Sequence, residues 1–393
     1  MHVVVDGATW MNERGYGRFT REVLSAAAAL PSRHHFTVVV DPSVPDEAVG
    51  GLPTARVQIG TPPGKAASAG GRRSVADLWA MSRALARQPG DCVLFPSVYT
   101  YVPLAMRRPI LVCIHDAIAE RFPTFIFPTR RARLYWGLKT RAAISQASRI
   151  LTVSAHARRA IERQFHLSPD RIRIVPEAAA ACFRKDADTV GARETLERIG
   201  LAATARFVLY VGGIAPHKNL PALVDAMTHL RGHDQWADLR LLIVGDYQDD
   251  VFYSAYGDVR RHIEAAGAGA AVLAGRLADS VVAGLMRLSL ALILPSLDEG
   301  FGLPAMEAAA CGTAVLATRN SAMPDLLGDA AAYFDPAELG SLERELARLL
   351  ADEPARLALG VRAAAVASRY TWADAGRRLL DVFDELADEH TPT

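Results

Sequence analysis

The chain has 393 residues, of which half are hydrophobic and 22% are charged, and its formal net charge at pH 7 is +1. This length corresponds to two or three domains, each with enough apolar material for a core. The composition excludes a disordered chain, a collagenous repeat and a small disulfide-stapled scaffold.

The spacing of the cysteines and the first residues of the chain indicate the cellular compartment to expect. Four cysteines lie far apart, with no Cys-x-x-Cys pair: Cys92, Cys113, Cys182 and Cys311. This spacing predicts neither a zinc site nor a disulfide framework. The opening MHVVVDG is typical of a short strand rather than a signal peptide, and no apolar run reaches the roughly 20 residues that span a bilayer. We therefore expect a soluble, cytoplasmic protein.

The small net charge hides two halves of opposite sign. Residues 1–185 contain 26 basic and 13 acidic residues, whereas residues 186–393 contain 18 and 30. The segment 121–159 alone has nine basic residues and no acidic one. Such a run is either a solvated helix face or a surface for a phosphorylated acceptor or an anionic membrane.

Apolar runs alternate with helical patterns along the first half of the chain. We predict buried strands at residues 2–5, 36–40, 92–95, 110–114 and 149–153, and helices at 17–30 and 131–146. The Gly- and Pro-rich stretch 61–71 is expected to be a long loop.

The second half repeats this alternation. Strands are predicted at residues 207–211, 239–244, 271–273, 291–294, 314–317 and 331–334, and helices at 191–199 and 370–389. Apolar strands alternating with helices indicate parallel sheets covered on both faces. We therefore predict an α/β protein with two doubly wound, Rossmann-like domains, at 1–185 and 186–370.

Ligands of open α/β sheets bind at the carboxyl ends of the strands, so the turns that follow strands are the candidate sites. In the first half, Gly15 and Gly17 open a helix, which allows backbone N–H groups to approach an anion or a sugar. The strand at 110–114 ends in His115, a candidate for hydrogen bonding to sugar or phosphate, with Asp116 available to orient it. Asp116 alone is also compatible with a helix N-cap.

In the second half, the strand at 207–211 leads into the turn GGIAPHKN. The chain has only four lysines, and Lys218 lies in this turn at the start of a helix. An ammonium group beside a helix N-terminus suits a diphosphate.

The most specific element is PSLDEGFGLPAME at residues 295–307. A strand ends, a glycine-bearing loop turns, and Pro304 is expected at the first helical position. Gly302 and Leu303 would offer backbone N–H groups to a diphosphate or hexose. Glu299 would accept hydrogen bonds from hexose hydroxyls and Glu307 from ribose hydroxyls.

These motifs together resemble glycosyltransferase family 4, whose fold is GT-B. The resemblance rests on the Glu-x7-Glu element with GFGLP, on GGIAPHKN and on RYTW before the last helix. In the first half it rests on GYGRFTREVL, the strand ending in His-Asp, LTVSAHARRAIERQF and DRIRIVPE. It covers nearly the whole chain.

The resemblance implies retaining transfer of a hexose from a nucleotide sugar bound by the second domain to an acceptor bound by the first. His115, Lys218 and Glu299 would be the catalytic residues. The remaining donor-binding residues would be Gly17, Gly213, His217, Phe301, Gly302, Leu303 and Glu307, with Ser321 near the nucleotide; the acceptor-binding residues would be Tyr16 and Asp116. The closing helix, 371–390, would pack back on the first domain.

The chain departs from the family pattern at three positions. His217 and Gly213 stand where family members usually carry arginine, so the expected diphosphate clamp has less positive charge. Glu177 stands where the family has asparagine.

Two carboxylates placed for double displacement are not recognisable, so we expect front-face substitution, in which the leaving diphosphate oxygen accepts the acceptor's proton. The only Asp-x-Asp, at 186–188, lies in the linker, and we expect no metal, no cofactor and no nucleic-acid partner. The His-Asp strand end and the P-x-K-N turn resemble polysaccharide mannosyltransferases, which favours GDP-mannose over UDP-glucose or UDP-GlcNAc. The acceptor would be a saccharide, a lipid-linked saccharide or a small molecule.

Two other functions are compatible with the sequence. A nucleotide-sugar epimerase would turn over the donor without an acceptor. A non-catalytic sugar-nucleotide-binding partner would bind a nucleotide without turnover.

Overall fold

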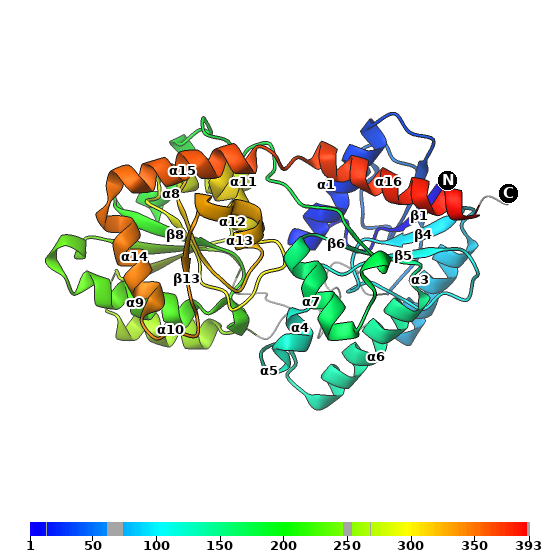
Figure 1. Ribbon diagram of the computed structural model, residues 1–393, viewed down its shortest axis with the longest axis horizontal. Coiled ribbons are helices and arrows are strands. Elements are labelled where there is room, and N and C mark those ends of the chain that lie inside the picture. The colour runs from blue at the N-terminus through cyan, green and yellow to red at the C-terminus, as the bar shows by residue number, and fades with distance from the viewer. Residues whose placement is uncertain (13, 61–73, 247–253, 268, 391–393) are drawn as a thin grey trace. The chain divides into compact units, whose positions relative to one another are not determined.

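The computed structural model describes residues 1–12, 14–60, 74–246, 254–267 and 269–390. The chain divides into two compact units (Figure 1). The first unit contains Met1–Glu177 and Thr371–Thr393, and the second contains Ala178–Tyr370.

The first unit is built on a seven-stranded parallel sheet with the order β3-β2-β1-β4-β5-β6-β7. Its strands are β1 (His2–Asp6), β2 (His35–Val40), β3 (Thr54–Arg56), β4 (Cys92–Phe95), β5 (Ile110–Cys113), β6 (Arg149–Thr152) and β7 (Ile172–Ile174). Its helices are α1 (Gly15–Ala29), α3 (Val75–Arg87), α4 (Ile118–Arg121), α5 (Pro123–Ile126), α6 (Arg130–Gln146), α7 (Ala155–Phe165) and α16 (Trp372–His390), with short 3-10 turns η1 (Asp46–Val49) and η2 (Pro169–Arg171).

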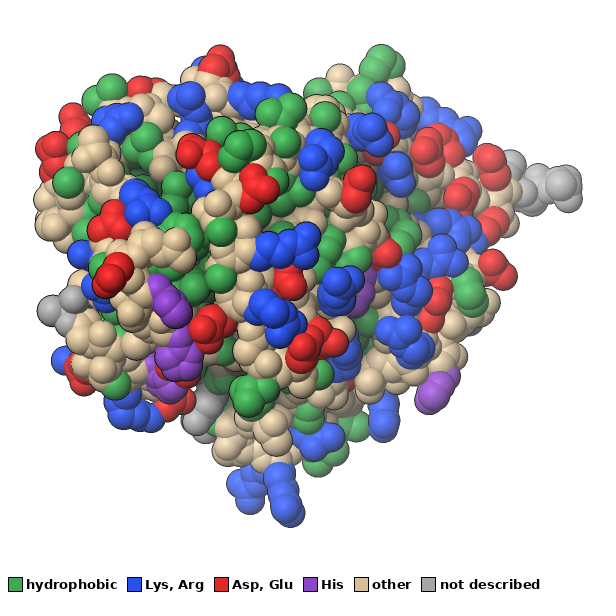
Figure 2. All heavy atoms as spheres, turned by 60° about the vertical axis from the view of Figure 1, so that its left-hand side comes forward, with side chains coloured by type: hydrophobic (Ala, Val, Ile, Leu, Met, Phe, Trp, Pro, Cys, Tyr) green, Lys and Arg blue, Asp and Glu red, His purple; other side chains and the backbone are tan. Residues whose placement is uncertain are grey.

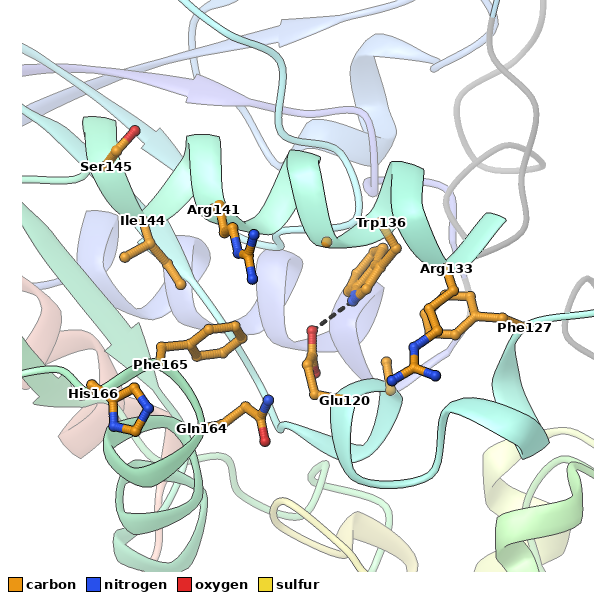
Figure 3. Close-up of a pocket in the computed structure, with 12 residues that line it drawn as sticks. Glu120, Phe127, Arg133, Trp136, Arg141, Ile144, Ser145, Gln164, Phe165 and His166 are labelled. Atoms are coloured by element: carbon orange, nitrogen blue, oxygen red, sulfur yellow. Dashed lines mark hydrogen bonds between the residues drawn. The ribbon is translucent and has the colours of Figure 1, made fainter. Parts of the chain in front are cut away.

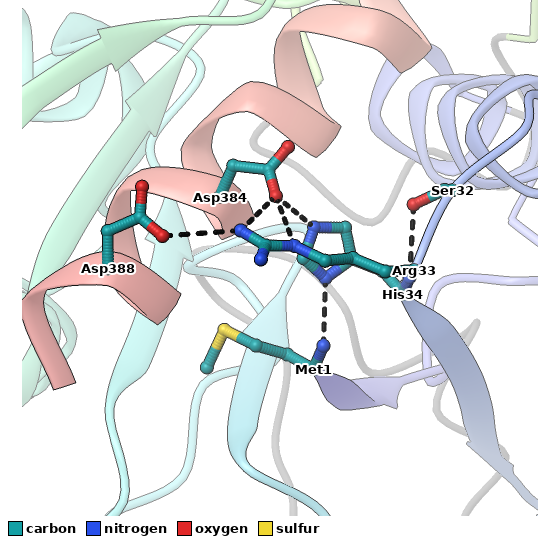
Figure 4. A network of polar contacts seen from close by, with 6 residues as sticks. All are labelled: Met1, Ser32, Arg33, His34, Asp384 and Asp388. Carbon is teal, nitrogen blue, oxygen red and sulfur yellow. Dashed lines mark hydrogen bonds and ion pairs between the residues drawn. The ribbon is translucent and has the colours of Figure 1, made fainter. Parts of the chain in front are cut away.

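The last helix, α16, belongs to the first unit and packs against α1. Gly376 permits this contact, because a Cβ atom there would lie 2.7 Å from the backbone nitrogen of Ala27. Polar contacts also hold the helix: the Asp384 carboxylate accepts from Arg33 at 2.7 Å and from the buried ring of His34 at 3.1 Å (Figure 4). The other ring nitrogen of His34 lies 3.0 Å from the amine of Met1.

The second unit has a six-stranded parallel sheet with the order β10-β9-β8-β11-β12-β13. Its strands are β8 (Phe207–Val211), β9 (Arg240–Val244), β10 (Ala271–Gly275), β11 (Leu292–Leu294), β12 (Val315–Thr318) and β13 (Ala332–Phe334). Its helices are α8 (Val190–Arg198), α9 (Leu220–Arg231), α10 (Tyr256–Ala265), α11 (Asp279–Leu288), α12 (Leu303–Ala310), α13 (Met323–Leu327), α14 (Ser341–Ala351) and α15 (Glu353–Ala367), with 3-10 turns η3 (Pro216–Lys218), η4 (Asp234–Trp236) and η5 (Gly328–Ala330).

The predicted α/β class and the two Rossmann-like sheets are confirmed, and every predicted strand is present within two residues at either end. The short strands β3 and β7 were not predicted, because three residues at a sheet edge give too brief an alternation. Pro304 is the second residue of α12, not the first, because Leu303 already has helical geometry. The predicted loop at 61–71 lies outside the described residues.

The chain passes between the units at Glu177–Ala178 rather than at the predicted 185/186. The connecting residues already pack on the second unit, since Arg287 donates to the carbonyl of Ala187 and the Lys185 side chain lies beside Gly312. None of the described helices combines the length and the apolar character that crossing a membrane requires.

Candidate active site

In the second unit, the sheet order reverses between β8 and β11, which are hydrogen-bonded neighbours although the segment from α9 to α11, with β9 and β10, lies between them in sequence. A reversal of this kind opens a crevice at the carboxyl ends of the two strands, where α/β proteins bind their ligands. The turn after β8 contains Lys218 and the turn after β11 contains Glu299.

These two side chains are in contact. The Lys218 Nζ donates to Glu299 Oε1 at 2.7 Å, and the Ser296 hydroxyl donates to the same oxygen at 2.5 Å. Only 22% of the Lys218 side chain and 10% of the Glu299 side chain are exposed. The pair is therefore mostly shielded from water, and both described contacts use the same carboxylate oxygen.

Backbone contacts fix the turns against each other. The Leu297 N–H donates to the His217 carbonyl at 2.8 Å, and the Asn219 side-chain amide donates to the Pro295 carbonyl at 3.3 Å. Asn219 has a left-handed φ of 54°. The turn after β12 joins them, because the Ala322 N–H donates to the Glu299 carbonyl at 3.1 Å. Lys218 and Glu299 are thus held by their own backbones as well as by each other.

The loop after β11 leads directly into α12. Gly302 precedes this helix with φ 80°, and a Cβ atom there would lie 2.9 Å from Met323 Cε. Glycine therefore allows both the left-handed turn and the close packing. Glu307 lies in the second turn of α12 and is 4% exposed.

His217 is buried beside Lys218. Burial, followed by the charge of Lys218, lowers the pKa of His217 to about 3, so the ring is neutral at pH 7. Its Nδ1 atom is buried and has no hydrogen-bond partner among the described residues. A neutral ring contributes no charge to this turn.

In the first unit, the sheet order reverses between β1 and β4, and His115 follows the next strand, β5. Its Nε2 donates to the Pro96 carbonyl at 3.0 Å, and its Nδ1 lies 3.4 Å from Glu177 Oε1. Burial alone would lower the pKa of His115, but Cys113 and the Glu177 carboxylate outweigh it, and the pKa lies well above its usual value.

Asp116 has a backbone contact at the start of the next helix. Its carboxylate accepts from the Ile118 N–H at 2.9 Å, at the start of α4. The His115 ring contacts the Pro96 carbonyl and the Glu177 carboxylate, and the orienting role of Asp116 remains a prediction. Asp116 thus satisfies a backbone N–H at the helix start, although the N-cap residue of α4 is Ala117.

The start of α1 lies against the same histidine. The Phe19 ring meets His115 edge-on at 4.9 Å, and Tyr16 lies 5.4 Å from Tyr99. A Cβ atom on Gly17 would fall 1.9 Å from the Asn12 carbonyl oxygen. Gly17 is therefore required for the turn to close.

Two family models match this chain, one in each unit. A model described as "Glycosyltransferase Family 4" matches residues 17–179, and one described as "Glycosyl transferases group 1" matches residues 192–366. The chain belongs to glycosyltransferase family 4. Its relatives include the O-antigen chain mannosyltransferase B of Escherichia coli, which is 26% identical over 73% of this chain and 72% of the relative.

Another relative is a serotype-specific mannosyltransferase of Escherichia coli, 26% identical over 64% of this chain; the match covers only 30% of that relative. Among solved structures, sucrose-phosphate synthase from Thermosynechococcus elongatus superimposes with a TM-score of 0.76 at 17% identity, covering 99% of both chains. The family 4 chain therefore has the GT-B fold.

The remaining predicted site residues of this family 4 member lie in the second unit and differ in exposure. Gly213 is exposed, and its carbonyl accepts from the Tyr210 hydroxyl at 2.7 Å. Phe301 is buried against Tyr370, and the Ser321 hydroxyl donates to the Thr318 carbonyl at 2.8 Å, so these two side chains are engaged in internal contacts. Leu303, 8% exposed, opens α12.

Sequence reasoning missed three residues of these sites. Ser296 and Asn219 both lie in turns that had been identified, but neither was assigned a role. Tyr99 follows β4 as His115 follows β5, so the rule that ligands bind at strand carboxyl ends could have found it. Among the described residues, no three His, Cys, Asp or Glu side chains are grouped to hold a metal ion.

Proposed function

We propose that this chain is a retaining hexosyltransferase that moves a hexose from a nucleotide sugar to a hydroxyl of a saccharide, lipid-linked or small-molecule acceptor. The observation that carries the proposal is the contact of Lys218 with Glu299 at the switch point of the second sheet, next to the N-terminus of α12. This arrangement offers a cation, a helix N-terminus and two shielded carboxylates, which are the groups that a nucleotide sugar requires.

In this proposal the donor binds to the second unit. Glu307 accepts from the ribose hydroxyls and Glu299 from the hexose hydroxyls, while the Lys218 ammonium and the N–H groups of Gly302 and Leu303 bind the diphosphate. Gly213 and His217 line the same turn. GDP-mannose is the favoured donor, because two relatives in the comparison are named mannosyltransferases.

The proposed reaction is a front-face substitution. The bond between the sugar and the diphosphate breaks, the acceptor hydroxyl forms the new glycosidic bond on the same face, and the leaving diphosphate oxygen takes the hydroxyl proton. Lys218 and the α12 N-terminus stabilise the leaving charge, so the step is proposed to need no metal. From the first unit, His115 takes part in the reaction and Tyr16 and Asp116 serve the acceptor.

Thermal stabilisation by UDP, GDP, dTDP and ADP tests the donor site. A nucleotide at 100 times its dissociation constant adds about 2.7 kcal/mol of stability. One nucleotide should stabilise the wild type and Glu345→Ala, a carboxylate variant on α14, but not Glu307→Ala. If none stabilises the wild type, the proposal is wrong.

Transfer itself is tested with the corresponding nucleotide sugar in EDTA, with the anomeric configuration of the product read by NMR. Retention without added metal supports the proposal. Binding without transfer to any saccharide indicates the non-catalytic partner, and donor turnover without an acceptor indicates an epimerase.

We also propose that the enzyme is cytoplasmic and docks on an anionic membrane surface through α6. This helix exposes three large apolar side chains, Leu134, Tyr135 and Leu138, beside exposed Arg130 and Arg131. In Figure 2, Lys and Arg side chains project from the lower tip of the surface, the region where α6 begins in Figure 1. Apolar residues flanked by arginines are typical of an interfacial helix.

Vesicle sedimentation tests this contact. Binding to vesicles with phosphatidylglycerol should exceed binding to neutral vesicles, and the double variant Leu134→Ser, Leu138→Ser should lose it. Equal binding to both vesicle types would contradict the docking.

A further inference from the structure

A cavity of about 460 Å³ lies in the first unit, among α4, α6 and α7. This volume falls within the range of small-molecule sites. Nothing in the proposed donor chemistry uses it. Figure 3 shows that the side chains facing the cavity come from all three helices and from the segment after α5.

Two arginines of α6, Arg133 and Arg141, extend into this cavity (Figure 3). Neither guanidinium group forms an ion pair or a hydrogen bond within the described part of the chain. Other arginines of the same basic segment are engaged: Arg149 pairs with Glu389, and Arg158 with Glu162 at 2.7 Å. The two cavity arginines are thus available to an anion.

The cavity also contains one carboxyl group. Glu120 on α4 accepts from the Trp136 indole N–H at 2.6 Å, as the dashed line in Figure 3 shows. Burial raises the pKa of Glu120 to about 7, the Trp136 hydrogen bond opposes this, and the charge of Asp116 adds to it. Near neutral pH this group can therefore donate a hydrogen bond to an anion rather than repel it.

The walls are aromatic. Phe127 and Phe165 line the cavity with Trp136, whose ring lies 6.2 Å from Phe127. A free inorganic anion makes no favourable apolar contacts with aromatic walls, whereas the C–H faces of a pyranose ring pack well on aromatic side chains. The combination of two arginines, a protonatable carboxyl and aromatic walls suits a sugar that carries an acidic group.

We propose that this cavity binds an acidic sugar, a pyranose with a carboxylate or phosphate group, held by Arg133 and Arg141 with its ring against Phe127, Trp136 and Phe165. Lying in the unit to which we assign the acceptor, it would hold an acidic unit of that acceptor. This last assignment rests on the proposed function; the binding itself does not.

Calorimetric titration without donor tests the site, with glucuronate, mannose 6-phosphate and uncharged glucose as probes. At least one acidic sugar should bind about tenfold or more tightly than glucose. Arg141→Gln should weaken that binding about tenfold, the value of a charge-assisted hydrogen bond. Arg131→Gln, an exposed change on α6 outside the cavity, should leave it unchanged.

Failure of both acidic sugars to bind, or equal weakening by Arg131→Gln and Arg141→Gln, would overturn the proposal. Both arginines are exposed, so neither variant is expected to unfold the unit, and circular dichroism checks this. Binding of both acidic sugars as weakly as glucose would also overturn it.

A pH series identifies the role of Glu120. Glucuronate keeps its charge between pH 6 and 8, so its affinity should fall severalfold over this range as Glu120 ionises. The titratable groups that interact electrostatically with Glu120 are Asp116 and Tyr99, and the charged or titratable groups that line the same cavity are Arg133, Arg141 and His166. The Glu120→Gln variant should no longer show this fall in affinity, whereas the His166→Gln variant should still show it. The opposite result would assign the pH dependence to His166 and remove Glu120 from the proposal.

Two variants separate this site from the proposed function. Glu307→Ala should lose nucleotide stabilisation yet still bind the acidic sugar. Arg141→Gln should keep nucleotide stabilisation and show a raised KM only for an acidic acceptor. If no nucleotide stabilises the wild type but the acidic sugar still binds, the proposed function and the acceptor assignment fail, while the binding of an acidic sugar in the cavity stands.

Discussion

The two units use the same kind of parallel sheet but assemble their candidate sites differently. In the second unit, Lys218, Ser296 and Glu299 come from two turns that face each other across one switch point, and their charges are paired. In the first unit, His115 contacts Glu177, which lies 62 residues further along the chain, at the end of the unit's first segment. A site made from two compact motifs can be recognised in the sequence, whereas a site whose supporting residue is remote depends on the fold.

The sharpest test of this comparison removes the cation of the second unit. Lys218→Met should lower kcat/KM by about 10³-fold, because a preorganised charge on the leaving group is lost and Glu299 keeps a shielded, unpaired carboxylate. The measurement is hexose transfer at fixed acceptor. Lys185→Met, a lysine of the same unit outside the site, should stay within about twofold; a comparable loss there would point to general destabilisation.

The glycines of the two sites should differ in their effect on stability. Gly17→Ala places a Cβ atom against a backbone carbonyl and should cost about 3 kcal/mol, whereas Gly302→Ala meets the flexible end of Met323 and should cost about 1–2 kcal/mol. Gly137→Ala on α6, with no atom within 4 Å, should be neutral or slightly stabilising. Scanning calorimetry measures all three, and equal costs would contradict the contacts described.

The third test concerns Glu177. Glu177→Gln removes a carboxylate that raises the pKa of His115, so the alkaline limb of the kcat/KM profile should move to lower pH, with about a tenfold loss at pH 8. The pKa of His115 is higher in the folded protein than in the unfolded chain, where it is about 6.5. The contact between His115 and Glu177 therefore stabilises the protein fully below about pH 6.5, and this stabilisation is lost as the pH rises through the folded pKa.

NMR titration of the His115 ring follows this pKa directly. Glu162→Gln, a surface carboxylate on α7 of the same unit, serves as the control and should leave the titration unchanged. An unchanged His115 titration in Glu177→Gln would remove Glu177 from the site.

The smallest effect is expected at α16. Asp384→Asn should cost only about 0.5 kcal/mol, because its partner Arg33 is 60% exposed and water screens the pair. Desolvation opposes the ionised form, but Arg33 and His34 outweigh it and lower the pKa of Asp384. The contribution of Asp384 to the free energy of unfolding is therefore present above the pKa that this carboxyl has in the unfolded chain. It is lost as the pH falls through the lower pKa of the folded protein. Urea denaturation at pH 7 and pH 3 measures this contribution. If the free energies of unfolding of the variant and the wild type differ by the same amount at both pH values, the pairing is contradicted.

Much of the fold could be read from the sequence because both sheets are parallel and buried. Strands such as β4 and β8 are uninterrupted apolar runs, and their predicted bounds equal the observed ones. The edge strands β3 and β7 are too short for this signal. Lys218, Glu299 and Glu307 could be singled out as candidates because all three lie within short motifs, and the structure shows the first two in contact.

The rest depended on contacts between distant segments. Glu177 was noted only as a departure from the family pattern, and its contact with His115 depends on the fold, which brings the end of segment 1–177 next to the residue that follows β5. Likewise Arg133 and Arg141 were part of an undifferentiated basic run, and only the packing of α4, α6 and α7 distinguishes them from their neighbours. For Asp116, the sequence suggested its neighbour His115 as the partner, whereas its contact with the Ile118 N–H depends on how the chain turns into α4.

The return of α16 to the first unit has a consequence for the order in which the protein folds during synthesis. Residues 178–370 form a continuous unit, so they can fold as soon as they leave the ribosome. The first unit, although translated earlier, lacks the helix that covers α1 until residues 372–390 have emerged. The segment made first is thus completed last, and until then the apolar face of α1 is a surface for chaperones to protect.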